Sequence, residues 1–179
     1  MTTNAKLRPM RRLVQILEGD ADTKTPTLFR TTGLWHLFPE QSEASHRSLI
    51  SRAKDFGFIS QVCRGFLKNE LTNGDEQWYL FHLADLLRPH CFNYVSLESA
   101  LAIHDQNETS PNKTVSFITT GRSNRIRCNG LGTLEFVHSS TPIELQRQGL
   151  EYDDTRKAWI ASRDIALNDM VRHRRNPSF

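Results

Sequence analysis

The chain has 179 residues, enough for one large domain or two small ones and for at least one sizeable hydrophobic core. Its hydrophobic fraction of 37% and charged fraction of 24% indicate a globular protein with a modest core and exclude a disordered chain. The formal net charge is +3, and no apolar run approaches the roughly 20 residues that would span a membrane as a helix.

The first part of the chain predicts three helices followed by a β-hairpin. Apolar residues at helical spacing mark the helices; Thr31 or Thr32 caps the second and Ser42 caps the third. An Arg64-Gly65 turn joins two short strands. The predicted helices span residues 7–18, 31–38 and 42–56, and the strands span residues 58–63 and 66–68. This order within residues 1–70 is typical of a winged helix-turn-helix, a DNA-binding domain.

The third predicted helix has two different faces. At 100° per residue, Leu49, Ile50, Ala53 and Phe56 fall on an apolar face that we expect to enter the core. The opposite face carries small, hydroxyl and basic side chains, which suit a helix lying in the major groove of DNA. The DNA-contacting residues that we predict are Thr31, Arg47, Ser48, Ser51, Arg52, Lys54 and Arg64. The alternative is an ordinary solvated helix face.

The predicted wing and the distribution of charge favour the DNA-binding alternative. Arg64 lies at the tip of the hairpin, where a wing contacts phosphates or the minor groove. Residues 1–68 hold 11 Lys and Arg against 6 Asp and Glu, a charge of +5, while the remainder of the chain carries −2. A basic N-terminal part followed by a C-terminal part of nearly neutral charge fits a nucleic-acid-binding module joined to a second module.

The second part of the chain predicts a separate α+β domain. A polar, turn-rich segment over residues 69–77 is the best candidate for a linker. Asn129-Gly130 is a strong hairpin signal, a second hairpin turns near Asp153-Asp154, and Ser96 and Ser162 are expected helix caps. The predicted helices span residues 79–87, 96–104 and 162–170, and the strands span residues 113–119, 124–128 and 132–137. The fold class is therefore α+β: an N-terminal winged helix-turn-helix followed by a small mixed α/β-sheet domain over residues 78–179.

Three arginines gather around the predicted turn that follows residue 119. Arg122 lies in the turn, and Arg125 and Arg127 share one face of the next strand because they are two residues apart. They could form a second phosphate-binding patch or a surface for an acidic protein partner. They could equally be charges that protect an exposed strand from aggregation.

No pattern in the sequence indicates catalysis or metal binding. The seven histidines and three cysteines lack metal-ligand spacing, and no phosphate-binding glycine loop or nucleophile motif is present. His104-Asp105 could belong to a proton relay, but a histidine at a helix end more often caps carbonyl groups. We therefore expect no enzyme, no cofactor and no metal. The isolated cysteines and the lack of a signal peptide predict a cytoplasmic protein.

Several runs of residues resemble AbiEi-type antitoxins. In the first half the matching runs are Phe29–Thr32, Phe38-Pro39, Ser48–Arg52, Asp55–Ile59 and Arg64–Phe66. The more specific matches lie in the second half, at Tyr94–Leu101, Val115–Ser123 and Gly132–Phe136. Together they cover roughly residues 28–138. Residues 159–169 depart from the family's closing helix.

The resemblance implies a transcriptional autorepressor that is also the antitoxin of a toxin–antitoxin operon. In that family the protein binds inverted repeats in double-stranded DNA upstream of its own operon and neutralises a nucleotidyltransferase-like toxin. The family's recognition residues would correspond to Arg47, Ser48, Ser51, Arg52 and Arg64 of this chain. One alternative is a stand-alone regulator of a mobile element without a toxin. A second is an enzyme that a winged helix delivers to DNA, against which the lack of catalytic spacing argues.

Overall fold

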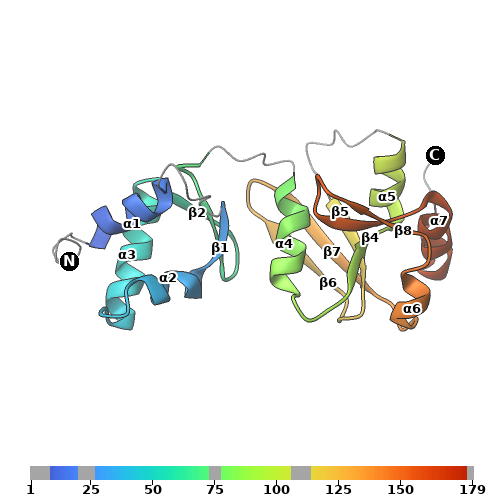
Figure 1. The fold of residues 1–179 in the computed structure, drawn as a ribbon, viewed down its shortest axis with the longest axis horizontal. Coiled ribbons are helices and arrows are strands. Elements are labelled where there is room, and N and C mark those ends of the chain that lie inside the picture. The colour runs from blue at the N-terminus through green and yellow to red at the C-terminus, as the bar shows by residue number, and fades with distance from the viewer. Residues whose placement is uncertain (1–8, 20–26, 73–77, 106–113, 177–179) are drawn as a thin grey trace. The chain divides into compact units, whose positions relative to one another are not determined.

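The protein contains two compact units. The computed structural model describes residues 9–19, 27–72, 78–105 and 114–176. The chain divides into Met1–Asp75 and Glu76–Phe179 (Figure 1). Each unit combines helices with its own sheet, so the α+β class expected from the sequence is confirmed. Among the described residues, no helix combines the length and apolarity that crossing a membrane requires.

The first unit packs three helices against a small antiparallel sheet. Its elements are α1 (Pro9–Glu18), β1 (Leu28–Arg30), α2 (Thr31–Leu37), α3 (Glu43–Asp55), β2 (Ile59–Cys63) and β3 (Phe66–Asn69). The strand order is β1-β3-β2, so that β3 lies between the other two strands. The core is formed by the apolar faces of the helices and strands. Its buried members include Leu13, Leu17, Leu34, Phe38, Leu49, Ala53, Ile59 and Leu67.

The second unit is built on a six-stranded mixed sheet with the order β6-β7-β5-β4-β9-β8. Its elements are α4 (Tyr79–Leu87), β4 (Asn93–Val95), α5 (Leu97–His104), β5 (Thr114–Thr119), β6 (Asn124–Cys128), β7 (Gly132–His138), α6 (Ile143–Gln146), β8 (Leu150–Asp153), β9 (Ala158–Ala161) and α7 (Arg163–Arg172). The pairs β4–β9 and β5–β7 are parallel, and the others are antiparallel.

Helices cover both faces of this sheet. Phe81 of α4 lies against Phe117, which stacks on Phe136 at 5.6 Å between ring centroids. Because side chains alternate along a strand, Ser116 points to the opposite face. There its backbone N–H donates to Ser99 of α5 at 2.8 Å, and α5 packs on α7. The sheet therefore lies between α4 on one side and α5 with α7 on the other (Figure 1).

The structure confirms most of the predicted elements and corrects several details. Helices and strands occur at each predicted place, although the start of the first helix before Pro9 lies outside the described residues. Two three-residue strands, β1 and β4, and the short helix α6 were not predicted. The linker prediction was wrong at Asn69, which ends β3 and is fully buried, and residues 73–77 of the predicted linker lie outside the described residues. Its side-chain amide donates to the Leu17 carbonyl at 2.7 Å, tying β3 to α1.

Three predictions about single side chains were wrong. Phe56 is 65% exposed rather than in the core, because α3 ends at Asp55 and the chain then turns. Its ring stacks on Phe58 instead. The N-cap of α2 is Arg30, without a side-chain capping bond, rather than Thr31 or Thr32. Ser96 is the N-cap residue of α5 as predicted, but its side chain makes no capping bond either.

Candidate nucleic-acid interface

The amphipathic pattern of α3 produces one exposed, polar face. The Ser42 hydroxyl accepts a hydrogen bond from the Ser45 backbone N–H at 3.3 Å and thereby caps the helix. Leu49, Ile50 and Ala53 are buried, which fixes the rotation of the helix about its axis. The residues left exposed by this rotation include Arg47, Ser48, Ser51 and Arg52, as the sequence predicts.

The basic side chains of α3 are held only by contacts at the surface. Arg47 pairs with Glu43 one turn earlier, and its side chain is 75% exposed. Arg52 donates to the Ser48 carbonyl at 3.4 Å, and Lys54 Nζ donates to Gln61 Oε1 of β2 at 2.6 Å. Exposed ion pairs contribute at most about 1 kcal/mol. A phosphate or a base edge can therefore replace these partners at low cost.

A hydrogen bond joins the turn of the β2–β3 hairpin to the start of α2. Gly65 has a φ of 81°, a left-handed conformation that favours glycine, and Arg64 beside it is exposed. The Gly65 carbonyl accepts from the Thr31 backbone N–H at 2.9 Å. Two of the predicted contact residues, Thr31 and Arg64, are thus brought together. The remaining five lie along α3 and are linked to β2 through Lys54.

A buried histidine, which sequence reasoning missed, connects α2 with α3. His46 is only 4% exposed, and its Nε2 lies 2.9 Å from the Phe38 carbonyl oxygen. Its ring stacks on Trp35 at 5.7 Å between ring centroids. These contacts fix the packing of α2 on the first turn of α3. The position of His46 on the apolar face was the signal available in the sequence.

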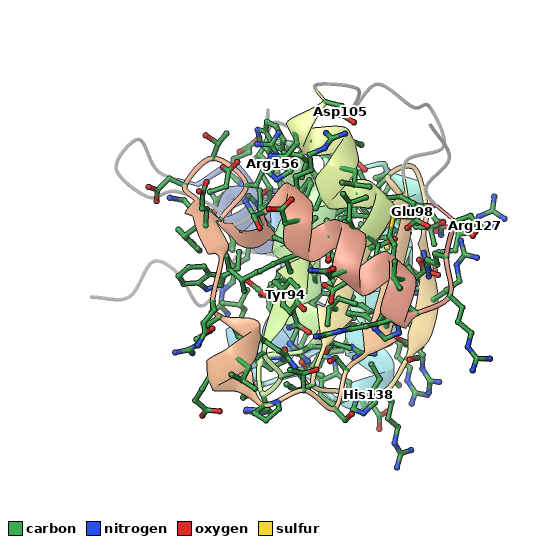
Figure 2. All side chains as sticks on the ribbon, turned by 90° about the vertical axis from the view of Figure 1, so that its right-hand side faces the viewer. Tyr94, Glu98, Asp105, Arg127, His138 and Arg156 are labelled. Atoms are coloured by element: carbon green, nitrogen blue, oxygen red, sulfur yellow. The ribbon has the colours of Figure 1, made fainter. Side chains whose placement is uncertain are left out.

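The three arginines of the second unit lie at one edge of its sheet. Arg125 and Arg127 are exposed on β6, which is an edge strand, and Arg122 is exposed in the turn before it. Arg125 Nε is 3.7 Å from Glu135 Oε1 on the neighbouring strand. Figure 2 shows Arg127 projecting from the surface. These positions are compatible with each of the three roles that the sequence suggests: a phosphate-binding patch, a surface for an acidic protein, or protection of an exposed strand from aggregation.

Arg88, which the sequence did not single out, shapes the turn that carries Arg122. Its guanidinium lies 3.9 Å from the centroid of the Phe136 ring and donates to the Arg122 carbonyl at 2.6 Å. It also donates to Thr119 Oγ1 and Asn124 Oδ1. A Cβ atom on Gly121 would come within 2.8 Å of the Arg88 guanidinium, so a side chain there would displace the guanidinium. Burial lowers the pKa of Arg88.

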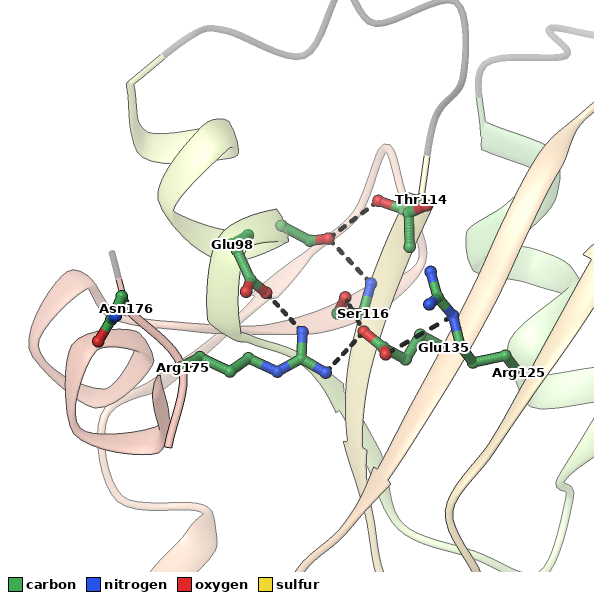
Figure 3. A pocket seen from close by; sticks show the side chains of 8 residues that line it. Glu98, Thr114, Ser116, Arg125, Glu135, Arg175 and Asn176 are labelled. Carbon is green, nitrogen blue, oxygen red and sulfur yellow. Dashed lines mark hydrogen bonds and ion pairs between the residues drawn. The ribbon is translucent and has the colours of Figure 1, made fainter. Parts of the chain in front are cut away.

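An open pocket of about 520 Å³ contains an ion-pair network (Figure 3). Arg175 contacts Glu98 of α5 at 2.8 Å and Glu135 of β7 at 2.9 Å. Glu135 also accepts from the Ser116 hydroxyl and faces Arg125. Because both carboxylates are matched by arginines, this network joins the segment after α7 to the sheet and needs no ligand to balance its charge.

No metal site or proton relay emerges from the described residues. They contain no group of three or more His, Cys, Asp and Glu side chains that could hold a metal ion. His104 Nε2 lies 2.9 Å from the Ala161 carbonyl oxygen, and Asp105 pairs with Arg163. The two residues are thus engaged by different partners rather than by each other.

No protein-family model matches the chain, and no curated protein matches it either.

Proposed function

We propose that residues 1–70 form a winged helix-turn-helix that binds double-stranded DNA in the cytoplasm. In this proposal α3 lies in the major groove and the β2–β3 hairpin is the wing. The observation that supports it best is the exposed face of Arg47, Ser48, Ser51 and Arg52 on a helix whose other face is buried. A recognition helix needs two such faces, because one face contacts the DNA bases while the other packs against the core of the domain.

The side chains on this face have the chemistry that DNA recognition requires. An arginine can donate to O6 and N7 of one guanine, and serine hydroxyls can contact either bases or phosphates. Arg47 is free to exchange its exposed Glu43 partner for DNA. Arg64 on the wing supplies a charge for phosphates or the minor groove.

The test is a binding titration with the duplex upstream of the protein's own gene and with a scrambled duplex. Arg47→Ala should cost about 1–3 kcal/mol on the upstream duplex and reduce the discrimination between the two. Arg64→Ala should weaken binding to both equally. Arg163→Ala, an exposed arginine of the second unit, is the control and should bind as the parent does. Unchanged binding by Arg47→Ala would contradict the proposal.

The resemblance to AbiEi-type antitoxins extends this proposal to repression of its own operon and neutralisation of a nucleotidyltransferase-like toxin. The second unit supports a separate antitoxin role because it has its own core and an arginine-bearing turn held by Arg88. Co-expression of the neighbouring toxin gene with residues 78–179 should restore growth, and the Arg122→Ala, Arg125→Ala double variant should abolish rescue. A soluble, folded fragment without rescue would refute the role. The alternative, a stand-alone regulator, requires that no toxin gene be adjacent.

A further inference from the structure

A second pocket, of about 250 Å³, lies on the face of the sheet that α7 covers. Residues of β4, α6 and α7 line it, and it is separate from the Arg175 network. Figure 2 shows Tyr94 of β4 between α6 and α7. Side chains from three elements that are distant in the sequence thus line the same small pocket.

The pocket contains a buried carboxylate that forms no ion pair with the described residues. Asp169 is only 4% exposed, and no ion pair joins it to any of the described residues. The Tyr94 and Ser96 hydroxyls both donate to Oδ2, at 3.0 and 2.7 Å. Burial, together with the nearby Asp169 carboxylate, raises the pKa of Tyr94, so this hydroxyl remains a donor. The two donors are neutral and share one oxygen, and His173 acts on this buried carboxylate only electrostatically.

The pocket also contains a buried acceptor without a donor. Gln146 of α6 is 5% exposed, and its Nε2 donates to the Thr141 carbonyl. This bond fixes the amide orientation, because only the NH₂ group can donate to a carbonyl oxygen. Oε1 is then buried and lacks a partner among the described residues. Native proteins rarely leave a buried acceptor unsatisfied without a functional reason.

The other side chains of the pocket limit the class of ligand. Arg172, one turn after Asp169 on α7, is exposed and makes no ion pair with the described residues. Leu145 and Ile165 supply apolar surface. We infer that this pocket binds a small α-amino acid with an aliphatic side chain. Its ammonium group donates to Asp169 and Gln146 Oε1, its carboxylate meets Arg172, and its side chain lies against Leu145 and Ile165.

The test is calorimetric titration of the full-length protein with L-leucine and two truncated analogues. Isocaproic acid lacks the amino group of leucine, and isoamylamine lacks its carboxylate. L-leucine should bind saturably, and each analogue should bind at least about tenfold more weakly, because each loses a charge-assisted contact. Absence of saturable leucine binding, or equal binding of the analogues, would overturn the inference.

Variants then test the individual contacts. Gln146→Leu removes the unsatisfied acceptor and should weaken leucine binding at least about tenfold, while the thermal midpoint stays equal or rises. Arg172→Gln changes an exposed side chain and should reduce the affinity for leucine to that for isoamylamine. Arg127→Gln, on the edge strand β6 and outside the pocket lining, is the control and should bind leucine as the parent does. Leucine binding that is unaffected by either pocket variant would place the ligand elsewhere and overturn the inference.

Discussion

Arg88 combines a stacking contact on Phe136 of β7 with three hydrogen bonds, which bind the end of β5, the turn after it and the start of β6. Arg88→Met retains the hydrocarbon stem but leaves the Arg122 carbonyl and the Thr119 hydroxyl without this donor. We expect the second unit to lose about 2 kcal/mol of stability. Urea unfolding followed by tryptophan fluorescence in a Trp35→Phe background measures it, because the other tryptophans, Trp78 and Trp159, belong to the second unit.

An exposed arginine of the same unit provides the control. Arg127→Met removes a side chain with equal charge from the outer face of β6. Its effect should stay within about 0.5 kcal/mol. If Arg88→Met and Arg127→Met unfold at the same urea concentration, Arg88 does not organise the turn.

His82 makes the stability of the second unit depend on pH. Burial lowers the pKa of this α4 histidine below its ordinary value of 6.5, with Lys157 acting in the same direction and Asp85 opposing. Below pH 6.5 the unfolded chain takes up a proton that the folded chain resists, so stability falls as the pH falls through this range. His82→Gln should lose less stability on acidification than the parent, measured by urea unfolding at a series of pH values. Parallel pH profiles would contradict this assignment.

Among the secondary-structure elements, α3 depends on its cap. Ser42→Ala removes the acceptor for the Ser45 N–H and should cost the first unit about 1 kcal/mol. Hydrogen exchange of the α3 amides would detect the loss as faster exchange in the first turn. Ser48→Ala, an exposed serine inside the helix, is the matched control and should leave exchange unchanged. Equal exchange in the two variants would show that the cap does not hold the helix.

Three serines show which features of the fold could be predicted from the sequence. Ser42 and Ser162 cap helices as predicted, because a cap depends on neighbours three residues away. Ser96 has the same sequence signal, yet its hydroxyl donates to Asp169, 73 residues later in the chain. The strands β1 and β4 were missed for a similar reason: three residues are too few to show periodicity, and distant partners define them.

The candidate interface likewise has some features that a local sequence pattern predicts and others that depend on distant contacts. The exposed face of α3 follows from helical periodicity alone, and it was predicted correctly up to Asp55. Phe56 was misplaced because the periodic rule was extended beyond the end of the helix. The roles of Arg88 and His46 depend on contacts between separate elements, which no local pattern contains.

For the whole molecule, the uneven charge predicts how DNA binding responds to salt. If Arg52, Lys54 and Arg64 each neutralise one phosphate while Arg47 contacts a base, the slope of log K against log salt should be about −2.7 per bound copy. Arg64→Ala should reduce this slope by about one unit, whereas Ser51→Ala should leave it unchanged. Titrations of the parent and both variants across a range of salt concentrations measure the slopes. A slope near zero would show that the basic residues of the first unit do not face the DNA.

The parallel pairing of β4 with β9 affects the order in which the protein takes shape during synthesis. Val95 pairs with Ile160, which comes 65 residues later in the chain. Helix α5 packs on α7, which is synthesised later still. The sheet of the second unit therefore stays incomplete until residues through Ala161 have left the ribosome, whereas the first unit uses only residues up to Asp75. Domains that finish first fold first on a growing chain. The first unit would thus be folded on the nascent chain while the second unit still exposes unpaired strands, the stage at which a chain is most prone to aggregate.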